Sequence, residues 1–405
     1  MIALKGRIID AISDKAIENG VVLMENDKIV RVSENNEIPE NTEVYEVKDG
    51  TIMPGFIDAH AHLNGEEDAG SFANGKMFGD KLMGSAYQAG VILDSGFTSI
   101  RDMSEAGLYV SRAQERGIIR APRIFPGGRL LGITSGHVDD DPTLSKDEYN
   151  RLYHDYRLVD GVDDCIQGVR EQFRLGARFI KICATGGVSS PTDRIDDVQF
   201  AAEELEAIVA EAKRHHSYVA AHCTGNEGAY ACLKAGVDCI EHGVFLTQRE
   251  IDLMKEKDAT LVTTLYIALN VANFPGLPDY LIEKAQNCAS ANRHTIEMAL
   301  KANLRIAFGS DFSNSKNTPY KKLGLEFKAM VEAGLSNIEA IRAGTINAAY
   351  LLKMDDQIGS LEEGKMADIV IVKGNPLKDI DCLTDADNIE YVFQSGKLVK
   401  GKQVN

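Results

Sequence analysis

The sequence predicts an α/β protein built around a (β/α)8 barrel. Between residues 55 and 358, short β-rich runs alternate with longer segments of helical period, the pattern of parallel strands joined by helices. Eight such runs fit the eight units of this barrel. Both ends of the chain, 1–54 and 359–405, show strand patterns and turn signals but no convincing helix. A doubly wound open sheet shares the central periodicity and is the competing fold.

The predicted elements follow in a regular order. The N-terminal segment contains the strand patterns GRIIDA, GVVLM, KIVRVS and TEVYEV, and the C-terminal segment contains MADIVIVKG and IEYVFQSGKLVKG. The eight candidate barrel strands are GFIDAH, FTSIRD, PRIFPG, FIKICAT, YVAAH, DCIEH, TLVTTLYI and RIAFGSD. Helices are predicted between them, for example over FAAEELEAIVAEAKRHH and NEGAYACLKAG, because apolar residues recur there at helical spacing.

Composition narrows the class of protein. The 405 residues are 44% hydrophobic and 26% charged, a balance typical of a folded chain with a large core. A formal charge of −17 repels nucleic acid and anionic membranes, so neither is an expected partner. There is no apolar run long enough to span a bilayer, and MIALKGRIID lacks the apolar core of a signal peptide, so a cytoplasmic location is expected. The seven cysteines contain no CxxC and are expected to be reduced thiols.

Two histidines stand one residue apart at the end of the first barrel strand, in GFIDAHAHLNG. Side chains at positions i and i+2 of a strand point to the same face, so His60 and His62 can reach one metal ion. Nine histidines in 405 residues give only about 0.2 such pairs by chance, which makes the pair informative without being decisive.

Four more polar residues end predicted barrel strands: Lys181, His222, His242 and Asp311. The C-terminal ends of the strands form the active-site face of a (β/α)8 barrel. A purely structural interpretation requires an unpaired buried lysine at Lys181, which is costly, and separate reasons for the other three residues. The set therefore predicts a metal-dependent active site.

These motifs resemble those of the amidohydrolase superfamily, and the resemblance covers essentially the whole chain. GFIDAHAH is similar to the family's strand 1 motif, FIKICATGG to its strand 4 lysine segment, AAHCTGNEG and CIEHG to its strand 5 and 6 histidine segments, and FGSDFS to its strand 8 aspartate segment. GSLEEGKMADIVIVKGNPL resembles the returning segment of the family's small β-sandwich domain. The resemblance implies two domains: a β-sandwich of residues 1–54 plus 359–405, and a barrel of residues 55–358.

The resemblance also implies two divalent metal ions, zinc above all, although the same ligand types accept Mn, Co or Fe. The implied ligands are His60, His62 and Asp311 for the buried ion, His222 and His242 for the more exposed ion, and Lys181 as a bridge between them. Lys181 would be modified by carbon dioxide to N6-carboxylysine. A neutral buried amine can capture carbon dioxide, and the resulting carbamate is an oxygen-donor anion suited to two cations.

Hydrolysis is the chemistry expected of such a site, because two ions lower the pKa of water and polarise a carbonyl. Asp311 is predicted to take up the proton of the attacking water and return it to the leaving group; the alternative is a purely structural ligand. His137, in GGRLLGITSGHVDDD, is predicted to bind the substrate and stabilise the developing oxyanion; the alternative is a loop histidine without a chemical role. The other histidines are predicted to lie in solvated surface positions: His154, His215, His216 and His294.

Two further patterns have ordinary interpretations. The glycine pair in ATGGVSS lacks the GK[ST] of a phosphate-binding loop, so a turn that lines the active site is predicted. The acidic clusters 66–68 and 139–141 follow predicted strands 1 and 3. They are interpreted as solvated loop charges, and the alternative is binding of a cationic substrate end.

Within the superfamily, KICATGGVSS and TSGH resemble the metal-dependent Xaa-Pro dipeptidase and arginine carboxypeptidase group, which is related to imidazolonepropionases. Prolidase-type members carry a tyrosine two residues after the strand 5 histidine, where it holds the substrate carboxylate, and this sequence has Thr224 there. Tyr266, at the predicted end of strand 7, is the other candidate for this contact; an ordinary tyrosine at the edge of the core is the alternative. The apolar loop YIALNVANFPGLPDYL favours an apolar leaving group.

The leading functional prediction is a binuclear zinc hydrolase of amide C–N bonds, a dipeptidase or carboxypeptidase-like enzyme. Its substrates would be Xaa-Pro dipeptides or N-acyl amino acids with an apolar C-terminal residue. The alternative is hydrolysis of cyclic amides, carbamates, ureas or imidazolones, and a non-catalytic scaffold is a remote third. The expected partners are a small-molecule or dipeptide substrate and further copies of the same chain.

Overall fold

The computed structural model describes residues 1–34, 37–64 and 78–403. Its strands are β1 Ile2–Ile8, β2 Ile17–Glu25, β3 Lys28–Ser33, β4 Glu43–Pro54, β5 Phe56–Ala61, β6 Phe97–Asp102, β7 Arg123–Pro126, β8 Leu130–Gly132, β9 Tyr156–Leu158, β10 Ile180–Cys183, β11 Val219–Cys223, β12 Cys239–His242, β13 Thr260–Thr263, β14 Ile306–Phe308, β15 Ile369–Lys373, β16 Ile389–Gln394 and β17 Lys397–Lys400. Strands therefore occur at both ends of the chain and throughout its middle.

The helices lie between β5 and β15, with short 3-10 turns among and after them. They are α1 Phe78–Asp94, α2 Glu105–Glu115, α3 Lys146–Leu152, α4 Val162–Leu175, α5 Ala202–Arg214, α6 Asn226–Ala235, α7 Gln248–Lys257, α8 Leu265–Asn270, α9 Asp279–Lys301, α10 Leu325–Glu332, α11 Asn337–Ala343 and α12 Ile346–Leu351. The 3-10 turns are η1 Val271–Asn273, η2 Tyr320–Lys322, η3 Ile380–Leu383 and η4 Ala386–Asn388. Among the described residues, no helix combines the length and the apolar character needed to cross a membrane.

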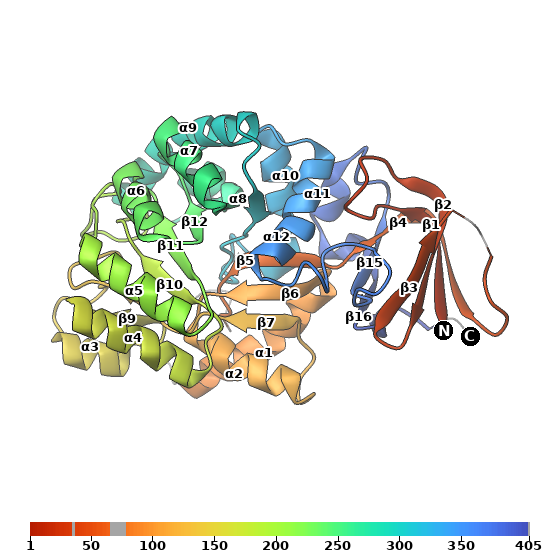
Figure 1. The fold of residues 1–405 in the computed structure, drawn as a ribbon, viewed down its shortest axis with the longest axis horizontal. Coiled ribbons are helices and arrows are strands. Elements are labelled where there is room, and N and C mark those ends of the chain that lie inside the picture. Colours follow the sequence, from red (N-terminus) through yellow and green to blue (C-terminus); the bar gives the residue numbers. More distant parts are fainter. Residues whose placement is uncertain (35–36, 65–77, 404–405) are drawn as a thin grey trace.

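The strands from the two ends of the chain form one seven-stranded sheet in the order β17-β16-β15-β4-β1-β2-β3. β4 joins the two contributions, because it pairs in parallel with β1 through residues 43–46 and 51–52 and antiparallel with β15 through residues 50–54. This sheet lies to one side of the rest of the molecule, and both termini lie there (Figure 1). The strand patterns predicted at the two ends are therefore confirmed as parts of one sheet.

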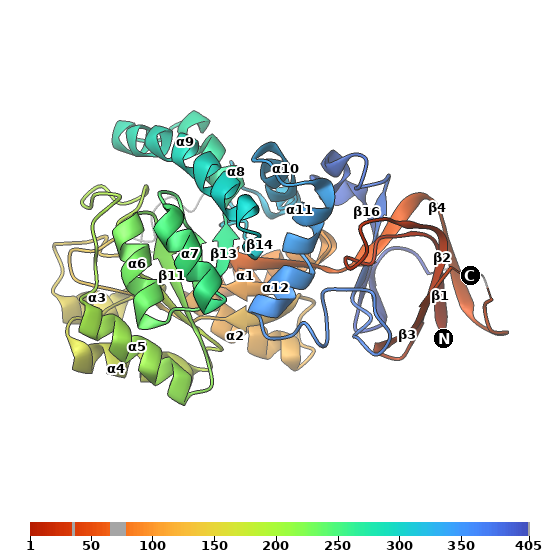
Figure 2. The same ribbon diagram turned by 45° about the horizontal axis from the view of Figure 1, so that its top comes forward.

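The central strands are parallel and form two sheets, β5-β6-β7 and β14-β13-β12-β11-β10-β8-β9. Hydrogen bonds connect the sheets at both edges. The Arg178 amide donates to the Pro126 carbonyl over 2.8 Å, and the Asp311 amide donates to the His60 carbonyl over 2.7 Å. The helices pack on the outside of these strands (Figures 1 and 2). The protein is thus a mixed α/β fold with parallel strands, an arrangement consistent with the predicted barrel.

The third predicted barrel strand is confirmed as β7, but the structure adds β8 and β9 after it and shortens the seventh strand. The third barrel strand is interrupted: β7 pairs with β6, and after Gly127 and Gly128 the chain continues as β8, beside β10 and the unpredicted strand β9. Gly127 is required at this break, because a Cβ there would lie 2.6 Å from the Phe179 ring. The seventh strand, predicted over 260–267, ends at Thr263, and helix α8 begins at Leu265.

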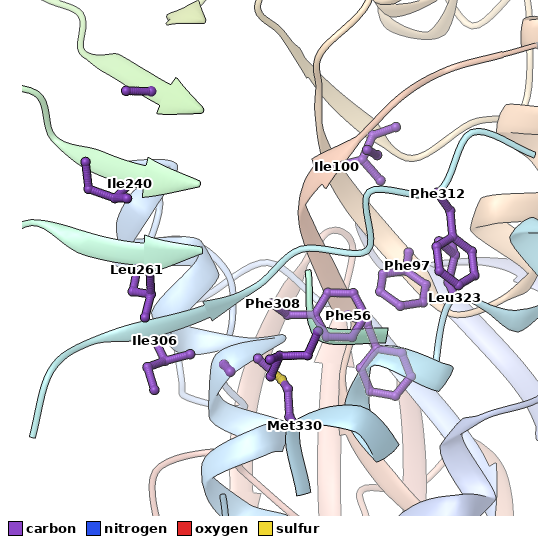
Figure 3. Close-up of a cluster of buried hydrophobic side chains, with 14 of the residues drawn as sticks. Phe56, Phe97, Ile100, Ile240, Leu261, Ile306, Phe308, Phe312, Leu323 and Met330 are labelled. Atoms are coloured by element: carbon purple, nitrogen blue, oxygen red, sulfur yellow. The ribbon is translucent and has the colours of Figure 1, made fainter. Parts of the chain in front are cut away.

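Aromatic side chains pack between the parallel strands and the helices that follow β14. The rings of Phe56 and Phe97 have centroids 5.6 Å apart, and Phe327 of α10 contacts both. Phe308 of β14 joins the group, 4.6 Å from Phe327, and Figure 3 shows it with neighbouring residues such as Ile306. Burial of these large apolar surfaces is the main stabilising contribution to this region, and it holds β5 and β14, which carry site residues, side by side.

Candidate active site

A cavity of about 880 Å³ opens at the C-terminal ends of the parallel strands. Each of β5, β10, β11 and β12 contributes at least one polar residue to its lining, and Asp311 reaches it from beyond β14. Eight of the predicted site residues line it: His60, His62, His137, Lys181, His222, Thr224, His242 and Asp311. The cavity therefore brings together the residues that the motifs single out, on the side of the strands where barrel active sites lie.

Three predicted ligands form the tightest group. Ligand atoms of His60, His242 and Asp311 all lie within 4.8 Å of one another, a spacing that could hold a metal ion. His62 joins them, with Nε2 3.0 Å from Asp311 Oδ1. Asp311 has a φ of 56°, and its amide is fixed to the His60 carbonyl, so the backbone itself presents the carboxylate to both histidines.

Lys181 is buried in β10, with 1% of its surface exposed, and its Nζ atom has no hydrogen-bond partner among the described residues. An unpaired ammonium in such a position is costly. Its charge lowers the pKa values of His60, His222 and His242, although burial is the larger cause for each. These imidazoles are therefore neutral at ordinary pH, which metal ligation requires.

His222 stands beside this group rather than within it. Its ring lies edge-on to His242, with centroids 4.6 Å apart. His222 Nε2 lies 3.2 Å from the Gly186 carbonyl and 3.3 Å from Thr224 Oγ1. With Nε2 engaged there, Nδ1 is the nitrogen left for a metal ion.

Two buried charges that sequence reasoning missed orient His60. Glu241 Oε2 lies 2.6 Å from His60 Nδ1, and Glu241 Oε1 accepts a hydrogen bond of 2.6 Å from Arg101. Burial raises the pKa of Glu241, but Arg101 and then Lys181 outweigh it, and the net shift is downward. Glu241 is therefore ionised and holds His60 with Nε2 toward Asp311, as outer-shell carboxylates do for ligating histidines. The sequence pattern that could have identified them is a charged residue inside a predicted barrel strand: Arg101 in FTSIRD and Glu241 in DCIEH.

The loop that carries Asp311 is fixed by a second buried carboxylate, Asp58. It accepts hydrogen bonds from the Ser310 hydroxyl over 2.5 Å and from the amides of Ser310 and His60, each over 3.0 Å. Gly309 is needed for this close approach, because a Cβ there would lie 2.7 Å from the Cβ of His60. Asp58 thus connects the strand 1 ligands to the Asp311 loop.

His137 also lines the cavity and stacks on His222, with ring centroids 4.6 Å apart. Its Nδ1 lies 3.0 Å from Asp193 Oδ2, and Asp193 was not recognised from the sequence because 56 residues separate the two. Gly187 of the predicted glycine turn lies against the ring, where a Cβ would approach within 2.3 Å. The turn that was predicted to line the active site therefore makes room for His137.

The two candidate carboxylate contacts differ in position. Thr224 is buried, lines the cavity and has its hydroxyl within 3.3 Å of His222. Tyr266 is in helix α8 rather than on a strand; its ring packs near Phe274 and Phe312, and it is not among the described residues that line the cavity. Its neighbour Ile267 faces the cavity instead.

The remaining predicted positions lie away from the metal-ligand group. Of the acidic clusters, 66–68 falls outside the described residues, and in the second cluster Asp140 lines the cavity while Asp139 accepts a hydrogen bond from the Ser135 amide. His154 stacks on Phe78 and His215 on Phe173, both with partly exposed side chains.

The cavity brings together polar side chains that could hold a metal ion, and comparison with known proteins identifies the class of protein. The amidohydrolase family model matches residues 51–399. The chain is 32% identical over 372 residues to the ochratoxinase of Aspergillus niger, covering 86% of this chain and 76% of that protein. This chain belongs to the amidohydrolase family.

Solved structures agree with this assignment. A prolidase in complex with N-methylphosphonate-L-proline superposes with a TM-score of 0.91 at 33% identity, over 99% of this chain and all of that one. A Xaa-Pro dipeptidase with methionine bound in its active site gives a TM-score of 0.88 at 30% identity, over 99% of this chain and all of that one. The protein is an enzyme that hydrolyses C–N bonds.

Proposed function

We propose that this protein is a binuclear zinc amidase that removes an apolar C-terminal residue from dipeptides or N-acyl amino acids. The observation that carries the proposal is the cavity that His60, His242, Asp311 and Lys181 line, in which the Nζ atom of Lys181 has no hydrogen-bond partner from residues 1–34, 37–64 and 78–403. Similarity to a prolidase, a Xaa-Pro dipeptidase and an ochratoxinase supports hydrolysis of an amide next to a carboxyl-terminal residue.

The donor set fits two divalent ions. Neutral imidazoles, a carboxylate and an oxygen-donor carbamate are ligands that zinc accepts. His60, His62 and Asp311 would hold one ion, His222 and His242 the other, and Lys181 both. Carbamate formation would balance as one lysine amine plus carbon dioxide giving the N-carboxylate and one proton, and it would resolve the unpaired nitrogen of Lys181. When bound, the ions supply Lewis acidity toward the scissile carbonyl and lower the pKa of water.

The chain's own residues would carry the proton and the substrate. Asp311, held between His60 and His62, would take the proton of the attacking water and deliver it to the leaving amine. His137 would donate from Nε2 to the carbonyl oxygen as negative charge develops, which requires a ring protonated on both nitrogens; the Asp193 carboxylate, which accepts from Nδ1–H, stabilises that form. Both groups line the same cavity, so an amide bound there could contact both.

An apolar wall on one side of the cavity supports the preference for an apolar leaving residue. The wall comes from the loop after β12, from α8 and η1, and from the start of α9. Its residues are Val244, Ile267, Ala268, Val271, Leu277, Pro278, Leu281, Ala285 and Cys288. The lysines in the described lining are Lys81, which pairs with Asp155, and Lys181, the predicted metal bridge, so neither is a dedicated site for an acidic side chain.

A second candidate follows from Thr224. Its hydroxyl lies within hydrogen-bond distance of His222, so it is a poorer carboxylate anchor than the tyrosine that prolidase-type relatives carry. Hydrolysis of cyclic amides, carbamates or ureas without a free carboxylate would need no such anchor.

The deciding experiment is a substrate panel with enzyme reconstituted in zinc and bicarbonate. The panel contains Xaa-Pro, Xaa-Leu and Xaa-Arg dipeptides, N-acetyl amino acids, and carbamate and cyclic amide probes. We expect turnover only of compounds with a free C-terminal carboxylate and an apolar last residue. Turnover confined to carboxylate-free probes would replace the proposal with the second candidate.

We also propose that the seven-stranded sheet of residues 1–54 plus 359–405 is a β-sandwich domain. In support, the Tyr45 ring of β4 meets Tyr391 and Phe393 of β16 edge-on, at centroid distances of 5.5 and 5.4 Å, although β15 separates these strands in the sheet. Limited proteolysis between 54 and 55 or between 358 and 359 would test these boundaries.

A further inference from the structure

Helix α9 is connected to the active site on two of its faces. Leu281, Ala285 and Cys288 follow at helical spacing and belong to the apolar wall of the cavity. Tyr280 and Lys284, one turn apart, instead contact the loop that follows β10. The helix that shapes the substrate pocket therefore also holds the loop beside His137.

Lys284 makes several of the hydrogen bonds between helix α9 and the loop that follows β10. Its Nζ atom lies within 3.0 Å of four oxygens of residues 187–193: the carbonyls of Gly187, Ser190 and Asp193, at 3.0, 2.7 and 2.7 Å, and Asp193 Oδ1, at 3.0 Å. Its side chain is only 17% exposed, so these contacts replace most of its hydration. A solvated lysine that shields the helix surface would not converge on one loop in this way.

Asp193 connects Lys284 to His137, because its carboxylate contacts both side chains. Its two carboxylate oxygens are used separately, Oδ1 for Lys284 and Oδ2 for His137 Nδ1, and Oδ2 also accepts from the Gly187 amide over 3.1 Å. The side chain of Asp193 is 1% exposed. Because a buried carboxylate needs a compensating charge, removal of Lys284 would leave Asp193 free to rotate or to be neutralised.

We propose that Lys284 is a positioning residue for amide hydrolysis: through Asp193 it fixes the imidazole of His137 relative to helix α9. The inference rests on the function proposed above, because it gives His137 the role of hydrogen-bond donor to the substrate carbonyl. It assigns a role in the chemistry to a residue that contacts neither the predicted metal ligands nor the cavity.

The test is a double-mutant cycle between K284M and H137N. In the wild-type background we expect K284M to lower kcat by about tenfold to a hundredfold, the range for residues that orient active-site groups, while KM and zinc content stay the same. In the H137N background K284M should cost less than about twofold, because the group that it positions is absent. K301M, an exposed lysine at the end of the same helix, is the matched control and should leave both parameters unchanged.

Several outcomes would overturn the inference. They are an unchanged kcat in K284M, an equal loss in the wild-type and H137N backgrounds, and a loss of zinc in K284M. If K284M does not fold, D193N takes its place in the cycle, since it breaks the same chain of contacts one step closer to His137.

A readout without turnover separates this inference from the proposed function. Proton-nitrogen NMR of the imidazoles, with H137N to assign the His137 signal, reports its Nδ1–H directly. We expect a downfield Nδ1–H resonance in the wild-type enzyme that moves upfield or exchanges away in K284M and not in K301M. If no probe of the panel is hydrolysed, the proposed function fails, and this signal still decides the positioning role; an identical signal in K284M would refute it.

Discussion

At the scale of single residues, the Asp311 carboxylate is predicted both to bind a metal ion and to accept the proton of the attacking water. It lies 3.0 Å from His62 Nε2 and 3.5 Å from His60 Nε2, and its φ of 56° is tolerated by Asp and Asn better than by most residues. Asp311→Asn therefore keeps the backbone and the shape of the side chain but removes the proton acceptor. We expect kcat to fall at least about a hundredfold with an unchanged circular dichroism spectrum, measured at matched zinc content. Activity close to wild type would contradict the role of Asp311 as general base.

Lys181 allows a sharper test because its nitrogen has no hydrogen-bond partner in the part of the chain that the structure describes. In Lys181→Ala the proposed bridging carboxylate is lost, so we expect zinc content to drop from two ions toward one or none and activity to fall with it. Short carboxylic acids such as formate or propionate should restore part of both, because the shortened side chain leaves room for them. Full zinc occupancy in the variant without any added acid would argue against the carbamate.

Most residues at the cavity that were predicted from the sequence share one property: they are polar residues in or just after an apolar strand, as Lys181 in β10 and His242 in β12 are. The structure brings these residues to one cavity, while their individual roles stay predictions. Asp193 and Arg101 were not predicted, because the role of each depends on a partner far away in the chain. Asp193 contacts His137, 56 residues away, and Arg101 contacts Glu241, 140 residues away. The local sequence pattern shows that a polar residue lies within an apolar segment, but it does not identify the partner that compensates its buried charge.

At the scale of elements, helix α8 is held at its start by a buried carboxylate of α10. Glu326 accepts hydrogen bonds from the amides of Leu265 and Tyr266, over 2.9 and 2.7 Å, and from the Thr263 hydroxyl over 3.0 Å. These contacts end β13 and begin α8, which explains why the strand predicted through 267 stops early. β propensity alone favoured a strand over TLVTTLYI, and a tertiary contact overrode it.

Glu326 gives this junction a pH dependence. Burial, only partly offset by its hydrogen bonds, raises the pKa of Glu326 to about 8 from a reference value of 4.5. Between these pH values the folded state retains a proton that the unfolded state releases, so the free energy of unfolding falls as the pH rises and levels off above about pH 8. In Glu326→Gln this contribution is absent, and we expect a flatter dependence, by up to about 1.4 kcal/mol per pH unit.

Urea unfolding of the zinc-loaded enzyme at pH 6, 7, 8 and 9 measures this difference. Burial raises the pKa of Asp58 to about 7 and that of Asp102 to about 6, so their contributions to the free energy of unfolding also fall as the pH rises. Both residues are present in both proteins, so these contributions cancel in the comparison. Parallel curves for the wild-type protein and Glu326→Gln would show that Glu326 is ionised in the folded state throughout.

At the scale of the whole molecule, the two ends of the chain meet in one sheet. β4 pairs with β15 across more than 300 residues, and the Thr51 hydroxyl donates to the Gly374 carbonyl over 2.6 Å. Strand patterns predict the individual strands at both ends, but an isolated pattern carries no information about a partner so distant. The resemblance to the amidohydrolase superfamily supplied the expectation that the ends meet, and the ring of parallel strands between them follows from the alternation of strands and helices.

Metal binding is the property that involves the whole ring. The predicted ligands come from β5, β10, β11 and β12 and from the segment after β14, so two ions would add cross-links between these strands to the pairing of neighbours and the buried contacts of Glu241. A ligand that binds only the folded state stabilises it by RT ln(1 + [L]/Kd), about 4 kcal/mol at a thousandfold excess over Kd. Chelation should therefore lower the thermal midpoint by several degrees, and zinc with bicarbonate should restore it.

Scanning calorimetry of the zinc-loaded and chelated enzymes measures this shift, with Lys181→Ala as the control in which chelation should have a smaller effect. Because neutral imidazoles are needed as ligands, the difference between the two forms should shrink as the pH falls and protons compete with the ions for the histidines. An identical midpoint in both forms, with two zinc ions measured in the untreated enzyme, would mean that the ions bind outside this cavity and that the ligand assignment must be revised.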